Sequence, residues 1–313
     1  MPGAKIRTST PMGMRSRLAD QPESGLVVID KPIGWTSHQV VGRVRRLAGT
    51  RKVGHAGTLD PMATGVLIIG VEKATRLLGY LSLADKAYEA TIRLGMATVT
   101  DDAEGEVVSA TGAADLQEAD VEAAIAKLRG EILQVPSSVS AIKISGERSY
   151  ARVRAGRDVE LAARPIQVSR FCVLASRVDE VAGVPVLDVD VQVECSTRTY
   201  VRALARDLGA ALGVGGHLTA LRRTRVGTVG IDEAQTLDEA AQRLVVLSPD
   251  QIVRRFFATV TVTDAQASYV RNGRRLTGLI LPEATTALIS GAGDLLALYR
   301  QEGTDALAEV VFL

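Results

Sequence analysis

The most regular pattern in this chain lies at residues 187–195, where apolar and polar side chains alternate without a break. A period of two residues is typical of a strand that buries one face and exposes the other. A second alternation at 86–94 predicts another half-buried strand, and the apolar face of residues 200–208 predicts a helix directly after the first strand. Half-buried strands combined with helices indicate an α+β fold with a mixed, mainly antiparallel sheet.

Other segments extend this outline in both directions. Residues 26–30 predict a short buried strand, and Ser37 is expected to cap a helix whose apolar face holds valines and a leucine. Further helices are predicted at 120–128 and 237–244, and residues 248–250 (Ser-Pro-Asp) are interpreted as a linker. The short apolar segments after this linker predict a small β-rich C-terminal domain, with strands at 256–262, 279–281, 286–289, 294–299 and 308–312.

A chain of 313 residues is too long for one small domain, so two folded units are expected. We predict a disordered basic tail at 1–22, a larger domain at 23–247 and the β-rich domain at 248–313. No apolar run approaches the roughly 20 residues that span a bilayer, and the basic N-terminus lacks the apolar core of a secretory signal. The two cysteines give neither a disulfide framework nor zinc spacing, so the expected compartment is the cytoplasm, with Cys195 in the core.

The basic residues are clustered although the net charge is only +1. Residues 31–52 contain six basic side chains and no acidic one, and two further basic clusters lie at 143–170 and 222–225. Such clusters form ordinary solvated faces, or they form a surface that binds a polyanion. Three clusters in a nearly neutral protein favour the polyanion. The acidic residues at 101–106 are interpreted as a solvated turn in preference to a divalent-cation site.

One acidic residue stands in an unusual local sequence. Asp60 lies between Gly57 and Gly65, directly before Pro61 and close to an apolar run at 66–69. The proline ring disfavours helical backbone at Asp60, so the carboxylate has a restricted direction. This arrangement suits an acid that must reach a substrate atom, and an ordinary turn acid before proline is the alternative.

Six short motifs follow one another along the chain. They are residues 30–37 (DKPIGWTS), 54–61 (GHAGTLDP), 86–88 (KAY), 140–143 (SAIK), 195–202 (CSTRTYVR) and 221–223 (LRR). Together they resemble the TruB family, the bacterial tRNA pseudouridine-55 synthases, from about residue 25 to 228. Residues 270–273, which open the β-rich part, are similar to a PUA-type RNA-binding domain. The resemblance implies a pseudouridine synthase catalytic domain followed by a PUA-like domain.

The resemblance also implies a reaction. A uridine in the T-loop of tRNA, at position 55, becomes pseudouridine: the bond from ribose C1′ to base N1 breaks, and C1′ rejoins the base through C5. The resemblance implies that the reaction needs no cofactor and no metal, and that the protein binds the T-arm stem-loop of tRNA. A monomer with no membrane contact and no obligate protein partner is expected. A tRNA-folding helper that opens and refolds the T-arm without catalysis is the alternative function.

The motifs assign roles to particular residues. Asp60 would be the catalytic carboxylate, which attacks C1′, adds to the base or takes a proton from the 2′ position. Arg202 would keep Asp60 ionised and aimed, and Tyr88 would stack on the extruded base and take the C5 proton. His55 would fill the gap that the extruded base leaves. The pocket would be organised by Lys31, Tyr200 and Leu221, and RNA backbone contacts are predicted at Arg43, Arg46, Lys143, Arg148, Arg198, Arg222 and Arg223.

Two features depart from the family pattern. Arg198 stands where the family usually has glycine, so the local turn differs or gains a phosphate contact. Residues 136–138 are Pro-Ser-Ser where the family has Pro-Pro, near the start of a long loop expected at 134–160. We predict that this basic loop, with a helical turn near 150–154, is disordered without RNA and clamps the RNA on binding.

Overall fold

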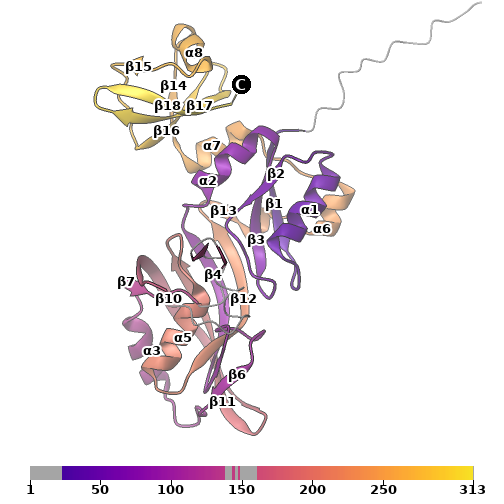
Figure 1. Cartoon of the computed structure of the whole chain (residues 1–313), viewed down its shortest axis with the longest axis vertical. Coiled ribbons are helices and arrows are strands. Elements are labelled where there is room, and N and C mark those ends of the chain that lie inside the picture. The colour runs from indigo at the N-terminus through magenta and orange to yellow at the C-terminus, as the bar shows by residue number, and fades with distance from the viewer. Residues whose placement is uncertain (1–22, 138–142, 145–146, 149–160, 313) are drawn as a thin grey trace, which may run out of the picture.

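The computed structural model describes residues 23–137, 143–144, 147–148 and 161–312. A large sheet forms the centre of the longer domain, with strands in the order β1-β3-β12-β4-β11-β10-β7, β2 beside β3 and β13 beside β12 (Figure 1). These pairs are antiparallel except β12 with β3, which confirms the predicted mixed, mainly antiparallel sheet. The strands are β1 (Gly25–Lys31), β2 (Val53–Ala56), β3 (Thr64–Val71), β4 (Lys86–Leu94), β7 (Gly130–Gln134), β10 (Arg164–Val181), β11 (Val184–Cys195), β12 (Gly216–Val226) and β13 (Val229–Gly230).

The two alternating segments of the sequence pair with each other. β4 and β11 are antiparallel neighbours, with Val191 opposite Ala90 and Val193 opposite Tyr88. These side chains are buried, and so is Cys195, which confirms the predicted half-buried strands and the core position of the cysteine. Side chains directly opposite each other share one face of a sheet, so the register fixes the side on which Tyr88 lies.

Helices cover parts of this sheet. α5 packs on β12 and α3 on β10, while α1 and α6 lie beside β1, β2 and β3 (Figure 1). Two small hairpins, β5 with β6 and β8 with β9, stand outside the large sheet. The bounds are α1 (Ser37–Leu47), α2 (Leu78–Leu81), α3 (Glu118–Ala126), α5 (Val201–Ala211), α6 (Leu237–Gln242), β5 (Met96–Thr98), β6 (Val107–Ala110), β8 (Lys143–Ile144) and β9 (Glu147–Arg148), with 3-10 turns at Glu72–Leu77 and Ile231–Glu233.

The start of α1 differs from the prediction in a way that concerns Asp60. Thr36, and not Ser37, caps the helix, because its side chain accepts a hydrogen bond from the Gln39 amide. Ser37 is the first helical residue and is buried. Its hydroxyl donates to the Leu59 carbonyl at 3.0 Å and accepts from the Leu59 amide at 2.9 Å. α1 is thereby joined to the residue that directly precedes Asp60.

The C-terminal strands form a five-stranded sheet in the order β14-β16-β17-β18-β15. The prediction of a linker at 248–250 is wrong, since Ser248 caps the helix α7 (Pro249–Phe256). Residues 279–281 do not form a strand, and residues 270–271 end the unpredicted helix α8 (Asp264–Arg271) and do not open a β-unit. The strands are β14 (Ala258–Thr261), β15 (Leu276–Thr277), β16 (Thr285–Ile289), β17 (Leu295–Glu302) and β18 (Asp305–Val311).

Helix α7 lies between the two sheets (Figure 1). Ile252 of α7 belongs to one buried apolar cluster with Leu26 of β1 and Leu298 of β17. The Asp250 carboxylate accepts a hydrogen bond from the Leu295 amide at 2.5 Å. The two sheets therefore share a core through this helix, which explains why residues 249–256 are ordered as a helix.

Some predictions concern residues outside the described part of the chain. The tail at 1–22 and the helical turn near 150–154 lie there. Within the loop expected at 134–160, residues 135–137 follow β7, and the β8–β9 hairpin adds two short strands that the sequence did not indicate. Among the helices that the structure describes, none is long and apolar enough to cross a membrane.

Candidate active site

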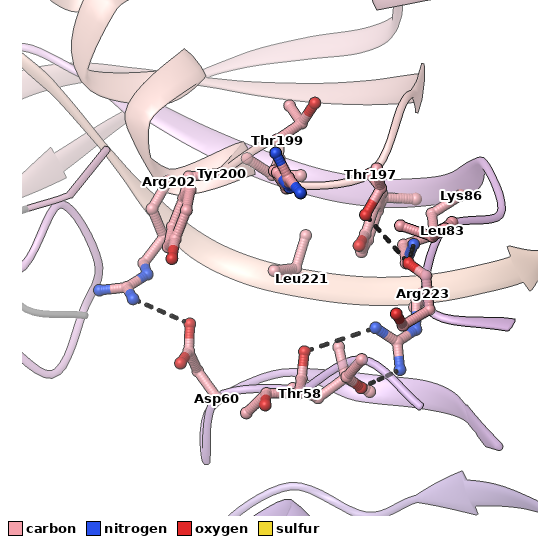
Figure 2. A pocket seen from close by; sticks show the side chains of 16 residues that line it. Thr58, Asp60, Leu83, Lys86, Thr197, Thr199, Tyr200, Arg202, Leu221 and Arg223 are labelled. Carbon is pink, nitrogen blue, oxygen red and sulfur yellow. Dashed lines mark hydrogen bonds and ion pairs between the residues drawn. The ribbon is translucent and has the colours of Figure 1, made fainter. Parts of the chain in front are cut away.

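A cavity of about 390 Å³ opens where the loop after β2 meets β4, β12 and the start of α5. Asp60 and Arg202 face each other on one side of it, Arg223 and Lys86 lie on the other, and Leu221 stands between them (Figure 2). The cavity brings together seven of the predicted site residues, namely Asp60, Tyr88, Arg198, Tyr200, Arg202, Leu221 and Arg223. The other residues that line it are Gly57, Thr58, Leu59, Ser82, Leu83, Lys86, Thr197, Thr199 and Val201.

Glycine and proline shape the loop that contains Asp60, residues 57–65, which we call the acid loop. Gly65 has a φ of +101°, and a side chain there would place its Cβ 2.1 Å from the Arg223 carbonyl oxygen, so only glycine fits. The Ala63 amide donates to the Asp60 carbonyl at 3.1 Å and closes a turn around Pro61. The Asp60 side chain is 40% exposed, so its carboxylate reaches the cavity and is not sealed in the core.

Arg202 connects Asp60 to a second carboxylate. Its Nη2 lies 3.0 Å from Asp60 Oδ2 and its Nη1 lies 3.2 Å from Asp102 Oδ2, while Nη1 also donates to the Thr100 carbonyl at 2.8 Å. The Arg202 side chain is only 5% exposed. A planar guanidinium held on two sides has one orientation, so Arg202 fixes the position of the Asp60 carboxylate.

Asp102 is a site residue that the sequence did not reveal. The interpretation of 101–106 as a solvated turn is wrong for its first two residues, because Asp101 and Asp102 are 7% and 3% exposed. The Thr98 hydroxyl donates to the Asp102 carbonyl at 2.7 Å, and the Thr100 hydroxyl donates to the Asp102 carboxylate. Two threonines that closely precede the acidic pair were the available signal, since a buried acid needs donors close by.

Tyr88 and Arg223 form the opposite part of the cavity. They stand directly across from each other on β4 and β12. Burial raises the pKa of Tyr88, and the charge and hydrogen bonding of Arg223 act against this rise. Arg223 is 1% exposed and donates to the carbonyls of Val66, Gly57 and Thr58 at 2.7, 3.1 and 3.5 Å. The prediction that Arg223 lies on the surface as an RNA backbone contact is corrected, because its guanidinium is buried and bound to the acid loop.

Lys31 supports the acid loop from outside the cavity. It is fully buried, and its ammonium donates to the carbonyls of Trp35, Pro32 and Pro61 at 2.6, 2.9 and 3.3 Å. Burial lowers the pKa of Lys31 to about 8, and the negative charge of Asp60 acts against this fall. Lys31 therefore organises the loop through its backbone and does not line the cavity itself.

His55 and Tyr200 take different positions around the site. His55 lies on β2 outside the cavity lining, and its buried Nδ1 has no hydrogen-bond partner among the described residues. Burial lowers the pKa of His55, and the nearby positive charges of His38 and Arg223 lower it further. Tyr200 lines the cavity, and Gln134 of β7 binds both its backbone amide at 2.9 Å and its carbonyl at 3.1 Å.

Comparisons with known proteins identify the family of this chain. The family model for the TruB family pseudouridylate synthase N-terminal domain matches residues 45–201, and the model for the tRNA pseudouridylate synthase B C-terminal domain matches residues 202–283. The tRNA pseudouridine synthase B of Arthrobacter sp. (strain FB24) is 58% identical over 297 residues, which cover 92% of this chain and 96% of the relative. The chain belongs to the TruB family. Its reaction class is therefore that of the pseudouridine synthases, which are isomerases.

Further relatives support the TruB assignment. The tRNA pseudouridine synthase B of Nocardia farcinica (strain IFM 10152) is 58% identical over 299 residues, which cover 94% of this chain and 96% of that protein. Among solved structures, a Cbf5-Nop10-Gar1 complex contains a chain that is 26% identical with a TM-score of 0.69, covering 92% of this chain and 85% of that one. An H/ACA RNP bound to a substrate RNA has the same identity and coverage and a TM-score of 0.68.

The remaining predicted RNA contacts of this TruB chain are dispersed. Arg222 forms an ion pair with Asp30 at 2.7 Å, and neither Arg43 nor Arg46 of α1 lines the cavity. Lys143 and Arg148 are opposite each other in the β8–β9 hairpin, and their side chains lie outside the description. Arg198 lines the cavity, is exposed, and has a φ of +68°. This left-handed backbone suits glycine, so a glycine would be free of strain here.

Proposed function

We propose that this chain isomerises uridine 55 in the T-loop of tRNA to pseudouridine, with Asp60 as the essential carboxylate. The observation that supports this most directly is the pair of Asp60, which reaches the cavity, and Arg202, which is buried at 3.0 Å from it. Relatives 55 and 58% identical are named tRNA pseudouridine synthase B, which supports tRNA as the substrate. Position 55 rests on the resemblance of the motifs around Asp60, Tyr88 and Arg202.

The cavity suits one extruded nucleotide. Ligand sites that enclose a small molecule measure roughly 300 to 1,000 Å³, and this cavity measures about 390 Å³. Tyr88 and Leu221 provide flat and apolar contacts for the uracil ring. A base inside a folded T-loop must leave its stack to reach Asp60. His55, on β2 directly before the acid loop, would fill the gap that the extruded base leaves in the stack. Arg198, Arg43 and Arg46 would bind phosphates around the cavity.

The chemistry needs one carboxylate and moves one proton. Asp60 starts the reaction by attack on C1′, by addition to the base, or by removal of the 2′ proton, which it returns to C2′ when C1′ bonds to C5. The C1′–N1 bond breaks, the uracil turns, and C5 bonds to C1′. C5 then loses a proton and N1 gains one, so substrate and product are isomers and nothing is oxidised. Tyr88 faces the base as the acceptor of the C5 proton. Burial raises the pKa of Tyr88, and Arg223 acts against this rise.

Pseudouridine mapping of an unmodified tRNA transcript tests the proposal. The transcript is incubated with the full chain and no added cofactor, and pseudouridine is located by chemical labelling and primer extension. We expect a single modified position, at 55, and no product with Asp60→Asn. The matched control is Asp120→Asn, because Asp120 is an exposed acid of α3 that does not line the cavity. A normal rate with Asp60→Asn, or modification at another position, would contradict the proposal.

Binding measurements separate the proposal from a tRNA-folding helper. Asp60→Asn removes a carboxylate and no cation, so the affinity for tRNA should stay within about twofold of the wild type. A folding helper keeps its whole effect on tRNA in this variant, whereas an isomerase loses its product. Salt titration of the complex gives the number of phosphate contacts, because the logarithm of the binding constant falls linearly with the logarithm of the salt concentration.

A further inference from the structure

Two arginines one helical turn apart on α5 bind one turn of the chain at 100–102. Arg202 binds the Thr100 carbonyl at 2.8 Å and the Asp102 carboxylate at 3.2 Å. Arg206 binds the preceding residue, with its Nη1 3.3 Å from Asp101 Oδ2. Residues four apart on a helix lie on the same face, so α5 presents both guanidinium groups to this turn.

The turn has a backbone conformation that must be held in place. Asp101 has a φ of +60°, in the left-handed region, which is unfavourable for a residue other than glycine. The Asp101 carbonyl accepts a hydrogen bond from the Leu218 amide at 3.0 Å. This backbone places the Asp101 carboxylate toward Arg206 and the neighbouring Asp102 carboxylate toward Arg202, so one strained residue serves both arginines.

The segment that leaves β7 joins the same cluster. The Ser137 hydroxyl donates to Asp101 Oδ2 at 2.7 Å and is fully buried. Arg206 Nη2 donates to the Val135 carbonyl at 2.7 Å. One guanidinium and one hydroxyl therefore bind the same carboxylate from two different segments of the chain. Burial raises the pKa of Asp101 in spite of these donors. Desolvation of this carboxylate therefore opposes folding, and stability alone does not explain its presence.

We propose that Asp101, Arg206 and Ser137 are positioning residues for Arg202. They hold the turn at 100–102, with Asp101 in its left-handed conformation, and this turn directs Arg202 toward Asp60. The proposal rests on the proposed function, since its readout is the rate at which Asp60 reacts. None of the three residues lines the cavity, so they act through Arg202 and not by contact with the nucleotide.

Steady-state kinetics on the tRNA transcript tests this role. Asp101→Asn keeps the shape of the side chain and removes the charge that Arg206 binds, and Ser137→Ala removes one donor. We expect kcat to fall about 10- to 100-fold for Asp101→Asn and less for Ser137→Ala, because small displacements of a reacting group have effects of this size. KM and the affinity for tRNA should stay unchanged. Because a loss of folded protein would also lower the apparent kcat, kcat is calculated per enzyme molecule that binds tRNA, counted by stoichiometric titration.

Asp207→Asn is the matched control. Asp207 is a second carboxylate on Arg206, with Oδ1 2.9 Å from Nε and 2.8 Å from Nη2, and within the described part of the chain it makes no hydrogen bond or ion pair to the turn. Its variant should keep the wild-type kcat. The double variant Asp101→Asn with Arg206→Gln should lose little more activity than Asp101→Asn alone, because both changes remove the same contact.

Asp101→Gly separates backbone strain from side-chain contact. Glycine adopts a φ of +60° without strain, so this variant keeps the turn accessible and lacks only the carboxylate. We expect kcat to fall here too. Wild-type kcat in Asp101→Gly and Ser137→Ala, or an equal loss in Asp207→Asn, would overturn the positioning role. An inactive wild-type protein would instead contradict the proposed function, so the two failures are distinguishable.

Discussion

The two sides of the cavity are held by different kinds of bonds. On the acid-loop side, residues 57–65 are held by Arg223 and Lys31, whose cations donate to backbone carbonyls. On the arginine side, the turn at 100–102 is held by Arg202 and Arg206, whose guanidinium groups mainly meet carboxylates. Carbonyls neither titrate nor depend on side-chain identity, whereas carboxylates do both. The difference teaches that Asp60, the proposed catalytic acid, stands on a fixed backbone, and its partner Arg202 stands on an adjustable network of charges.

Arg202→Met should have the largest effect, because it removes the cation that joins the two sides. Asp60 and the buried Asp102 both lose a charged partner. We expect kcat to fall about 1,000-fold, the size seen when a preorganised charged donor is lost from an active site. Arg202→Lys should recover only part of the rate, since an ammonium cannot bind two carboxylates in one plane. Single-turnover kinetics with saturating enzyme measures the chemical step directly, and a loss below tenfold would contradict the comparison.

Arg223→Met tests the acid-loop side and should act first on stability. Removal of the guanidinium leaves the carbonyls of Gly57, Thr58 and Val66 without this donor. The free energy of unfolding should fall by about 3 kcal/mol, since charged hydrogen bonds in buried places contribute roughly 1.5 to 3 kcal/mol each and partial solvation offsets some of the loss. Urea unfolding measures this change.

The salt dependence of tRNA binding gives Arg223→Met its second readout. A buried Arg223 contacts no phosphate, so the slope of binding against salt should not change. A slope reduced by about one would show that Arg223 binds RNA after all. Arg222→Met is the matched control on the same strand, because Arg222 is half-exposed and paired with Asp30.

The two sides also differ in how far the sequence could predict them. The determinants of the acid-loop side are local: glycine at 57 and 65 and proline at 61 surround Asp60 and restrict its backbone. The arginine side brings together residues that are distant in sequence, and an acidic run such as 101–106 has the same composition in a buried turn as in a solvated one. Only the packing of α5 against the turn distinguishes the two cases.

Two other errors have similar causes. The basic run at 222–225 suggested an RNA surface, but a strand turns successive side chains to opposite faces, so Arg223 points inward beside Arg222. Ser248 and Pro249 have the composition of a linker and equally that of a helix start, where serine caps and proline occupies the first turn. In contrast, the alternation at 86–94 and 187–195 was sufficient, because period-two burial depends on the local sequence alone.

The pH dependence of stability should have opposite signs on the two sides. Burial lowers the pKa of Lys31 to about 8, so between pH 8 and its ordinary value of 10.5 the folded protein has lost a proton that the unfolded chain still holds. This group therefore adds stability as the pH rises through that window, by at most about 1.4 kcal/mol per pH unit. The pKa of Asp101 is raised, so its contribution to stability falls as the pH rises through the acidic range.

Urea unfolding across both pH ranges measures these slopes. Lys31→Met should flatten the alkaline slope, and Asp101→Asn should flatten the fall in the acidic range, whatever each variant does to the absolute stability. Each variant serves as the control for the other, since the two groups titrate in separate ranges. An alkaline slope that is identical in Lys31→Met and the wild type would contradict the lowered pKa of Lys31 in the folded protein.

Arg198→Gly should have the smallest effect and the most unusual combination of signs. Arg198 stands between the two sides, on the segment that leads into α5, with a φ of +68°. Glycine adopts this backbone freely, so the free energy of unfolding should rise by up to about 1 kcal/mol. The affinity for tRNA should fall severalfold, and the salt slope should decrease by about one if the side chain binds a phosphate.

Two further variants separate the backbone of Arg198 from its charge. Arg198→Lys keeps both the strain and the cation, so it should match the wild type in affinity and salt slope. Ala182→Gly relieves a comparable backbone, φ +53°, in the turn between β10 and β11 and away from the cavity, so it reports the effect of glycine without any loss of charge. If Arg198→Gly binds tRNA as tightly as Ala182→Gly does, the Arg198 side chain does not contact a phosphate, and other cations make that contact.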